Sequence, residues 1–283
     1  MSIKLYHRNL SYSNELNQFV FYDTLLGETL GTNQEIPELI DHDVIDVTAG
    51  PRYTLIVDVN GDAFASGFIE SKYEYLGHFG VESDKLEEGS NSWQQIDKVT
   101  DIGGKESRAP PFAKVYAGAS ATANSGEQHS LFLDEDGNVY TAGNNDHGQL
   151  CLGDTDPRYI PNQVNLKEPA IAAALGEDFT LILLEDGTVY GCGPNEKGEL
   201  GLGDNTKTVN KPNNGNGLKD IFDISAGLNH ALFQTKGGNV FGTGSNIYMQ
   251  LCEFTDGEPI TSPKVSITSF SQCIQYLPLP SVV

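Results

Sequence analysis

Residues that could carry covalent or metal chemistry are few in this chain, and none has the spacing that such chemistry requires. The cysteines form no C-x-x-C pair, and the acidic run Asp134–Asp136 lacks the alternating spacing of a calcium-binding loop. The chain has no Gly-x-Ser-x-Gly nucleophile elbow, no His-Glu-x-x-His zinc motif and no phosphate-binding Gly-x-x-x-x-Gly-Lys-Ser/Thr loop. We therefore expect no catalytic residue, no metal ion and no cofactor, and the sequence favours non-covalent binding.

The composition argues against nucleic acids and membranes as partners. The chain has 283 residues, 38% of them hydrophobic, which is enough for one large all-β domain. Its net charge is −22, and so acidic a chain repels nucleic-acid phosphates and anionic membranes. No apolar run approaches the roughly 18–20 residues that span a bilayer, and the N-terminus lacks an apolar signal core. We expect a cytoplasmic monomer that neither binds nucleic acid nor inserts into a membrane.

One unit of sequence recurs along the chain. Residues 131–154 align with residues 181–204 at a shift of 50 without a gap, and 14 of the 24 positions are identical. In both copies an apolar run leads to an Asp-Gly turn, a Val-Tyr strand and a glycine-rich loop that ends in Leu-Gly-Asp. Asp-Gly between two strand-like runs is typical of a β-hairpin, because glycine adopts positive φ without steric cost.

A fixed spacing extends this pattern to four copies, since one glycine precedes each turn glycine by 11 residues. Repeats of this length with short strands predict an all-β propeller. Counting a degenerate copy in residues 1–45, we expect about five blades in a single domain, residues 1–283. The extra length of the second copy predicts an inserted loop region at residues 68–112. The glycine pairs are Gly50 and Gly61, Gly126 and Gly137, Gly176 and Gly187, and Gly227 and Gly238.

The cysteines fit this repeat as packing residues. Cys151 and Cys252 occupy the place that Gly201 has in another copy. Small buried side chains suit such a position, so we expect reduced thiols and neither disulfides nor metal ligands.

The repeat resembles that of the regulator of chromosome condensation family. That family's unit combines a Val-x-Ala-Gly strand end, a His-Ser/Thr-Leu strand, an acidic-Asp-Gly turn and a Gly-x-Asn-x-x-Gly-Gln-Leu-Gly-Leu-Gly-Asp loop. The resemblance covers residues 46–267 well and residues 1–45 weakly. It implies a propeller, and the short chain looks similar to compact bacterial effectors of this family that activate the small GTPase Ran. The motifs stand at residues 115–118, 127–131, 135–137 and 143–154.

The resemblance also implies a partner and a surface. Exchange factors of this family insert a β-wedge into the GTPase and use an acid that follows the first repeat glycine. A guanine-nucleotide exchange factor or activator of a Ran-like GTPase is therefore expected, secreted into the host cytoplasm if it is a bacterial effector. Its acids would compete for the lysine that binds the nucleotide phosphates. The partner-binding residues expected are Phe68, Glu70, Lys72, Tyr73, Glu74, Tyr75, Glu127, His129, Glu177 and Asp178.

Alternative interpretations remain open for these residues. The glutamates fit solvated turns as well as a partner surface, and the tyrosines of the insertion fit the cover of a blade. His129 aligns with Tyr53 and Phe179, which favours a packing role. The wedge-like loop also lies one repeat before Glu127, whereas both belong to one repeat in the family's namesake. The alternative function is a non-catalytic scaffold or inhibitor propeller that binds another protein.

Overall fold

The chain forms two compact units, Met1–Asp43 and Val44–Val283. In the first unit β1 (Leu10–Ser13) pairs antiparallel with β2 (Gln18–Phe21). Within the described part of the chain, no helix is long and apolar enough to cross a membrane. The computed structural model describes residues 10–13, 18–21, 43–51, 53–67, 77–82, 93–118, 128–203, 208–214, 217–251 and 258–267.

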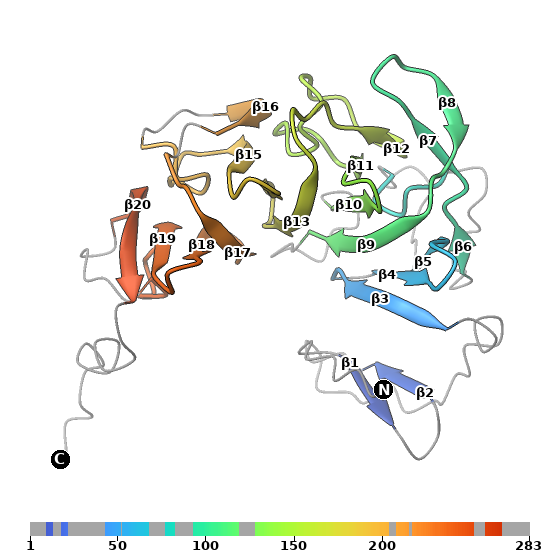
Figure 1. The fold of residues 1–283 in the computed structure, drawn as a ribbon, viewed down its shortest axis with the longest axis horizontal. Helices are drawn as coiled ribbons and strands as arrows, with labels where there is room; N and C mark the ends of the chain where they lie inside the picture. Colours follow the sequence, from blue (N-terminus) through green and yellow to red (C-terminus); the bar gives the residue numbers. More distant parts are fainter. Residues whose placement is uncertain are drawn as a thin grey trace. The chain divides into compact units, whose positions relative to one another are not determined.

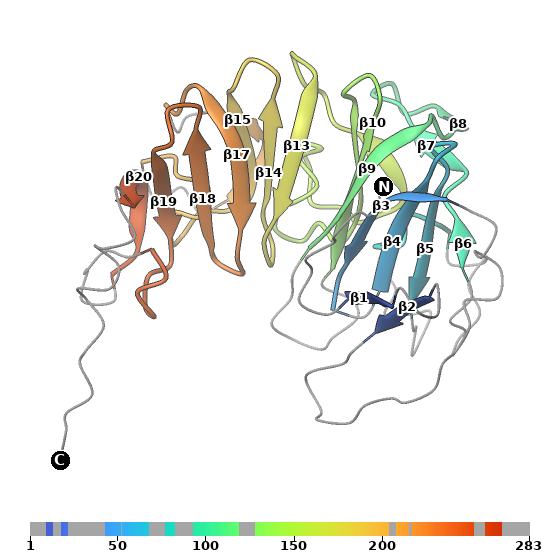
Figure 2. The same ribbon diagram turned by 60° about the horizontal axis from the view of Figure 1, so that its bottom comes forward.

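The described residues of the second unit form four β-sheets in chain order, which we call blades 1 to 4 (Figure 1, Figure 2). Blade 1 contains β3 (Val44–Ala49), β4 (Tyr53–Asp58), β5 (Ala63–Gly67) and β6 (Gln94–Gln95). Blade 2 contains β9 (Phe112–Ala117), β10 (His129–Asp134), β11 (Val139–Gly143) and β12 (Arg158–Gln163). Blade 3 contains β13 (Ala170–Leu175), β14 (Thr180–Leu184), β15 (Val189–Pro194) and β16 (Thr208–Asn213). Blade 4 contains β17 (Ile221–Ala226), β18 (His230–Thr235), β19 (Val240–Gly244) and β20 (Ile260–Ile267).

The all-β propeller arrangement is confirmed, but the expected number of about five blades is wrong. The described residues form four blades, and they include no helix. The fifth unit was counted from a weak copy in residues 1–45, whose described strands form only the β1–β2 pair. A two-stranded sheet lacks the strands that a blade needs to bury both of its faces.

The insertion at residues 68–112 adds strands to two blades. Its strand β6 completes blade 1 by pairing with β5, through Phe64 opposite Gln95. The hairpin of β7 (Lys98–Thr100) and β8 (Glu106–Arg108) extends blade 2, because β7 runs parallel to the outer strand β12. Part of the additional length is therefore sheet, and residues 68–76 and 83–92 lie outside the described residues.

Apolar side chains fill each junction between neighbouring blades. Strand β10 shows how the alternation of a strand serves two junctions at once. Phe132 packs in the cluster shared by blades 1 and 2, whereas its neighbours Leu131 and Leu133 pack in the cluster shared by blades 2 and 3. Strand β14 repeats the arrangement, with Ile182 on one face and Leu181 on the other. A run that is apolar at every position is what a strand buried on both faces requires.

The turns between second and third strands connect blades 2 and 3 to the blade that follows each of them. Gly137, Gly187 and Gly238 have φ of 82°, 81° and 84°, which confirms the positive φ predicted for these turns. The carbonyl of Gly137 accepts a hydrogen bond from Ala170 N at 2.9 Å, and that of Gly187 accepts one from Ile221 N at 3.2 Å. These turns therefore fix where the first strand of the following blade begins.

At the other end of the blades, the structure corrects one member of the glycine series. Gly118 N donates to His129 O at 2.9 Å, just as Gly176 N donates to Phe179 O at 2.8 Å. Gly118 thus takes the place that the 11-residue spacing assigned to Gly126. Ten residues lie between Gly118 and His129 where two lie between Gly176 and Phe179, so eight are inserted, and the spacing matched Gly126 because a glycine also stands three residues before His129. Residues 119–127 lie outside the described residues.

The expectation of reduced cysteines is wrong for Cys151 and Cys192. They form a disulfide between blade 2 and blade 3, with their Cα atoms 5.5 Å apart. Both are buried, as the repeat predicted for Cys151, but sequence spacing could not show that the two positions meet across a blade junction. Cys252 and Cys273 lie outside the described residues.

Candidate protein-binding site

The candidate site lies where the first strand of each blade turns into the second, an end of the blades that we call the junction rim. Glu177 and Asp178 occupy this turn in blade 3, between Gly176 and Phe179, and Leu228 and Asn229 occupy it in blade 4. In both blades the aromatic ring three residues after the glycine lies over that glycine. An added Cβ on Gly176 would come within 2.0 Å of the Phe179 ring, so only glycine permits this turn.

Glu177 is tied to the neighbouring blade. Its backbone nitrogen donates to Leu228 O at 3.0 Å, and its carboxylate accepts a hydrogen bond from Asn229 Nδ2 at 3.2 Å. Asn229 Oδ1 in turn accepts one from Lys197 Nζ at 3.0 Å, from the loop after β15. The carboxylate predicted to face a partner is therefore held by blade 4 on a partly open surface. Asn229 and Lys197 escaped sequence analysis because they approach Glu177 only once blades 3 and 4 pack together.

An exposed apolar loop lies on the same rim of blade 4. Ile247, Tyr248 and Met249 are 60%, 84% and 44% exposed, and Leu228 is 40% exposed. The loop follows β19, and Ser245 N at its start donates to Asn229 O at 2.7 Å. The equivalent loops of blades 2 and 3 carry Asp-His-Gly and Glu-Lys-Gly in these three positions. This change from charged to apolar residues was the sequence signal that could have identified the loop.

Three asparagines hold the loops of the junction rim in a common shape. Asn145, Asn195 and Asn246 each accept a hydrogen bond at 2.9 Å through Oδ1, from the backbone nitrogen of the leucine five residues later. The Nδ2 group of Asn145 also donates to Asp154 O, Asp154 Oδ1 and Asp156 O, each at 3.1 Å. A buried amide with this many partners gives the loop one defined conformation.

The remaining predicted site residues divide into two groups. Asp178 is half-buried beside Glu177, and its backbone oxygen faces Gly193 of β15 closely enough that no Cβ would fit there. His129 is fully buried, which favours the packing interpretation over a direct partner contact. The seven others lie outside the described residues: Phe68, Glu70, Lys72, Tyr73, Glu74, Tyr75 and Glu127.

His129 lies between blades 2 and 3, where its Nε2 atom lies 3.0 Å from Thr180 Oγ1. Burial lowers the pKa of His129 to about 4, since the charged imidazolium would lose its hydration. His129 is therefore neutral at physiological pH. Among the described residues, its Nδ1 atom and both polar atoms of the buried Gln128 side chain have no hydrogen-bond partner.

Acid should destabilise the protein partly through His129. Its unfolded pKa is about 6.5, so below this pH the unfolded chain binds more protons than the folded one, and stability falls until the pH reaches the folded pKa of about 4. At pH 5 the loss is roughly 2 kcal/mol. His129→Phe, which places the residue type of Phe179 at the equivalent position, should remove this term. Between pH 7 and pH 5, the free energy of unfolding of the variant, measured with urea, should rise by about 2 kcal/mol relative to that of the wild type. If the difference between the two proteins were the same at both pH values, the assignment would be contradicted.

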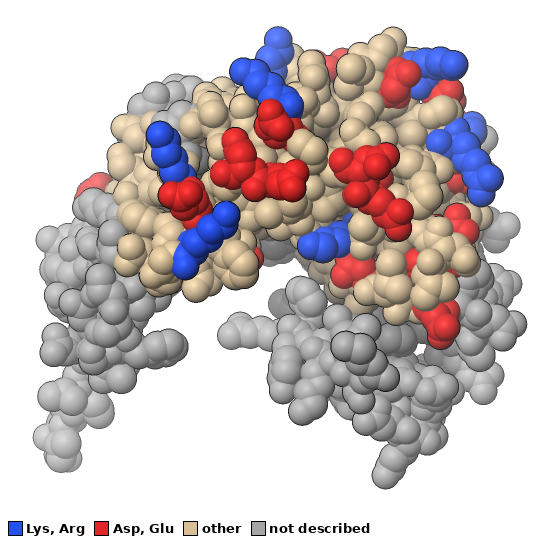
Figure 3. Space-filling model, viewed as in Figure 1, with Lys and Arg blue, Asp and Glu red and all other residues tan. Residues whose placement is uncertain are grey.

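Charge on one face of the second unit is mixed in sign. Acidic side chains lie among lysines and arginines there, and no broad basic patch covers the described residues that this view shows (Figure 3). Turn acids such as Glu135, Asp136, Glu185 and Asp186 are exposed at the opposite end of the strands from Glu177. They provide acidic groups for comparison with Glu177 on a surface away from the junction rim.

Comparison with known sequences identifies the repeat. Residues 136–183 and 186–234 match the Regulator of chromosome condensation (RCC1) repeat, and a second form of that repeat matches residues 121–149 and 170–199. Over 135 residues the chain is 36% identical to the probable E3 ubiquitin-protein ligase HERC4 of Rattus norvegicus and 38% identical to that of Mus musculus. This is 48% of the chain but 11% of each relative, so the chain spans about a tenth of their length.

Solved structures match more of the chain at lower identity. Prp20p from Saccharomyces cerevisiae, described together with its binding properties to Gsp1p and histones, gives a TM-score of 0.62 at 20% identity and covers 81% of this chain and 51% of that one. Human WBSCR16 gives 0.56 at 23% identity, covering 72% and 48%. The chain thus spans about half the length of these proteins, and identities this low establish the fold alone. The chain carries RCC1 repeats folded as propeller blades, which confirms the resemblance inferred from its sequence.

Proposed function

We propose that this chain is a protein-binding propeller that acts on a small GTPase of the Ran type, as a guanine-nucleotide exchange factor or activator. The observation that carries the proposal is the position of Glu177, an acid held by Asn229 of the next blade on the junction rim. The exposed Ile247–Met249 loop on the same rim supplies apolar area of the kind that anchors protein interfaces. The binding of Gsp1p ascribed to Prp20p, a protein of the same fold, supports a partner of this class.

The proposed action requires no covalent chemistry. A nucleotide is held in a small GTPase largely by contacts to its phosphates, and a lysine of the GTPase is among them. The Glu177 carboxylate would offer that lysine a charge-assisted hydrogen bond in place of the phosphate. The apolar loop would contribute buried area that stabilises the nucleotide-free complex. Exchange then follows because the propeller binds the empty GTPase better than the loaded one.

A non-catalytic binding module is the second candidate function. The match to HERC4, in which the chain corresponds to 11% of a longer protein, favours a propeller that recruits partners for another domain. The two functions differ in whether bound nucleotide is released.

The experiment that separates them is nucleotide release from a panel of small GTPases, Ran included, each loaded with a fluorescent guanine nucleotide. An exchange factor should accelerate release from at least one member at substoichiometric concentration. Binding without acceleration would support the module, and neither binding nor acceleration across the panel would overturn the GTPase proposal.

A further inference from the structure

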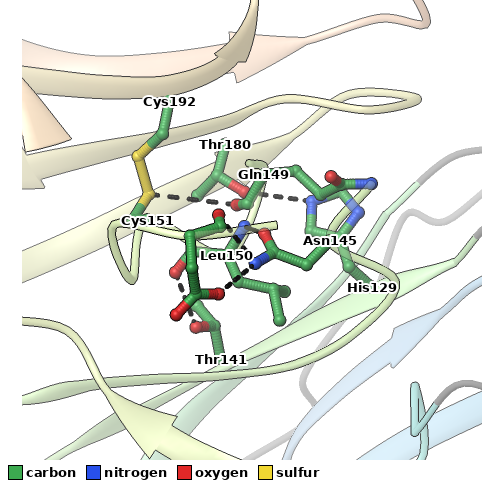
Figure 4. Close-up of a disulfide and its surroundings, with 9 residues drawn as sticks. His129, Thr141, Asn145, Gln149, Leu150, Cys151, Thr180 and Cys192 are labelled. Carbon is green, nitrogen blue, oxygen red and sulfur yellow. Dashed lines mark hydrogen bonds between the residues drawn. A yellow bond between two sulfur atoms is a disulfide. The ribbon is translucent and has the colours of Figure 1, made fainter. Parts of the chain in front are cut away.

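The disulfide joins blade 2 to blade 3 through two buried residues. Cys151 lies in the loop after β11 of blade 2, and Cys192 lies within β15 of blade 3, 41 residues further along the chain. Figure 4 shows the bond beside the loop that Asn145 and Leu150 hold in place. The two residues are 2% and 0% exposed.

The backbone at Cys151 is one that glycine prefers. Cys151 has a φ of 65°, and the equivalent residue of blade 3, Gly201, has a φ of 67°. A side chain at positive φ is strained, so glycine would serve the turn better unless the side chain has a use of its own. In Cys151 that use is the disulfide with Cys192.

The next blade junction has the same geometry without sulfur. An ideal Cβ on Gly201 would lie 3.3 Å from Cγ2 of Thr243, the residue equivalent to Cys192. The repeat therefore brings this pair of positions together at successive junctions. Among the described residues, only the junction of blades 2 and 3 has a cysteine at both positions.

We propose that Cys151 and Cys192 are an oxidation site, and that its closure staples blade 2 to blade 3. The co-reactant is a small disulfide such as oxidised glutathione. The thiolate of Cys151, on the loop, attacks one glutathione sulfur and expels the first glutathione thiolate. The thiolate of Cys192 then attacks Cys151 Sγ and expels the second. Two protein thiols are oxidised to one disulfide, one glutathione disulfide is reduced to two thiols, and the two protons pass to them.

Burial makes the staple long-lived once it has formed. A reducing thiolate must reach a sulfur atom along the S–S axis, and both sulfur-bearing residues are enclosed between blades. The native protein should therefore resist reduced glutathione, and reduction should require opening of the junction. The same argument places closure of the bond early, while blades 2 and 3 are still packing together.

The first test is thermal unfolding in a Cys252→Ser, Cys273→Ser background, which compares oxidised protein with protein that was unfolded in urea, reduced with tris(2-carboxyethyl)phosphine and refolded in its presence. The bond closes a long loop of the unfolded chain, so its reduction should lower the melting temperature by roughly 8–15 °C. The matched variant Cys151→Gly, Cys192→Thr carries the residues that the next junction uses. It should melt at the same temperature with and without the reductant, close to the reduced parent.

The second test is intact-mass analysis after alkylation with iodoacetamide. The native oxidised parent should take up no label, and the unfolded, reduced parent should take up two. Labelling of both cysteines in protein that was folded under glutathione disulfide, or a parent melting temperature indifferent to reduction, would overturn the proposal. Neither result bears on GTPase binding, so the disulfide proposal can be overturned without affecting the proposed function, and the proposed function can be overturned without affecting the disulfide proposal.

Discussion

Gly137→Val should lower the melting temperature more than Gly238→Val, although both glycines occupy the same turn position with nearly equal φ. A β-branched residue at positive φ costs roughly 2 kcal/mol in either turn. At Gly137 the new Cβ would also lie 2.6 Å from Pro169 Cβ and 3.0 Å from Ala170 O, where blade 3 begins. The two costs together should reach about 4 kcal/mol, a fall of roughly 8–16 °C in a domain of this size.

Gly238 is the matched control, because a Cβ there would meet no atom of the described residues within 4 Å. Gly187→Val should fall between the two, since its Cβ would lie 3.2 Å from Asp220 Cα and Ile221 N. Calorimetry on the three variants would give this order if the turns position the following blade. An equal fall in melting temperature at all three positions would mean that each turn stabilises only its own hairpin and does not position the following blade.

Asn145→Ala is expected to have the other large effect on stability. The change removes the acceptor for Leu150 N and the donor to Asp154 and Asp156 in a buried loop. Buried groups that lose their partners cost about 1–3 kcal/mol each, so a total of roughly 3–4 kcal/mol is expected. The melting temperature should fall by about 6–16 °C.

Asn165→Ala provides the control for Asn145→Ala, because Asn165 is exposed in the loop after β12. Its replacement should change the free energy of unfolding by less than about 0.5 kcal/mol. If Asn145→Ala proved as mild as Asn165→Ala in urea unfolding, the shared asparagine of the three loops would not be what fixes their conformation.

The blades could be predicted because their determinants are local. The alternation of Leu131, Phe132 and Leu133 specifies a strand buried on both faces, and the Asp-Gly turn specifies where the chain reverses. Both signals recur at a shift of 50 residues, and the structure repeats with them. The weak copy in residues 1–45 lacks these signals in full, and the blade count inferred from it was wrong.

Features that depend on contact between blades could not be predicted. The pairing of Cys151 with Cys192, and the placing of Asn229 beside Glu177, arise only when neighbouring blades pack. Sequence analysis assigned this repeat position to Gly126, although Gly118 occupies it in the structure, because an insertion restored the 11-residue spacing by coincidence. Of the candidate site, the sequence could place Glu177 and Asp178 in the turn between the first two strands of blade 3, whereas the apolar loop beside them was overlooked although its residue types carried a signal.

The affinity of Glu177→Lys for the most responsive GTPase of the panel tests the central claim most directly. A control of equal charge is Glu185→Lys, since Glu185 is exposed at the opposite end of the same strand. If the junction rim binds the partner, Glu177→Lys should weaken binding at least tenfold, because a charge-assisted hydrogen bond contributes about 1.5–3 kcal/mol. Glu185→Lys should bind as wild type does, and both variants should melt within a few degrees of it. Full binding by a folded Glu177→Lys variant would contradict the account and move the partner surface away from this rim.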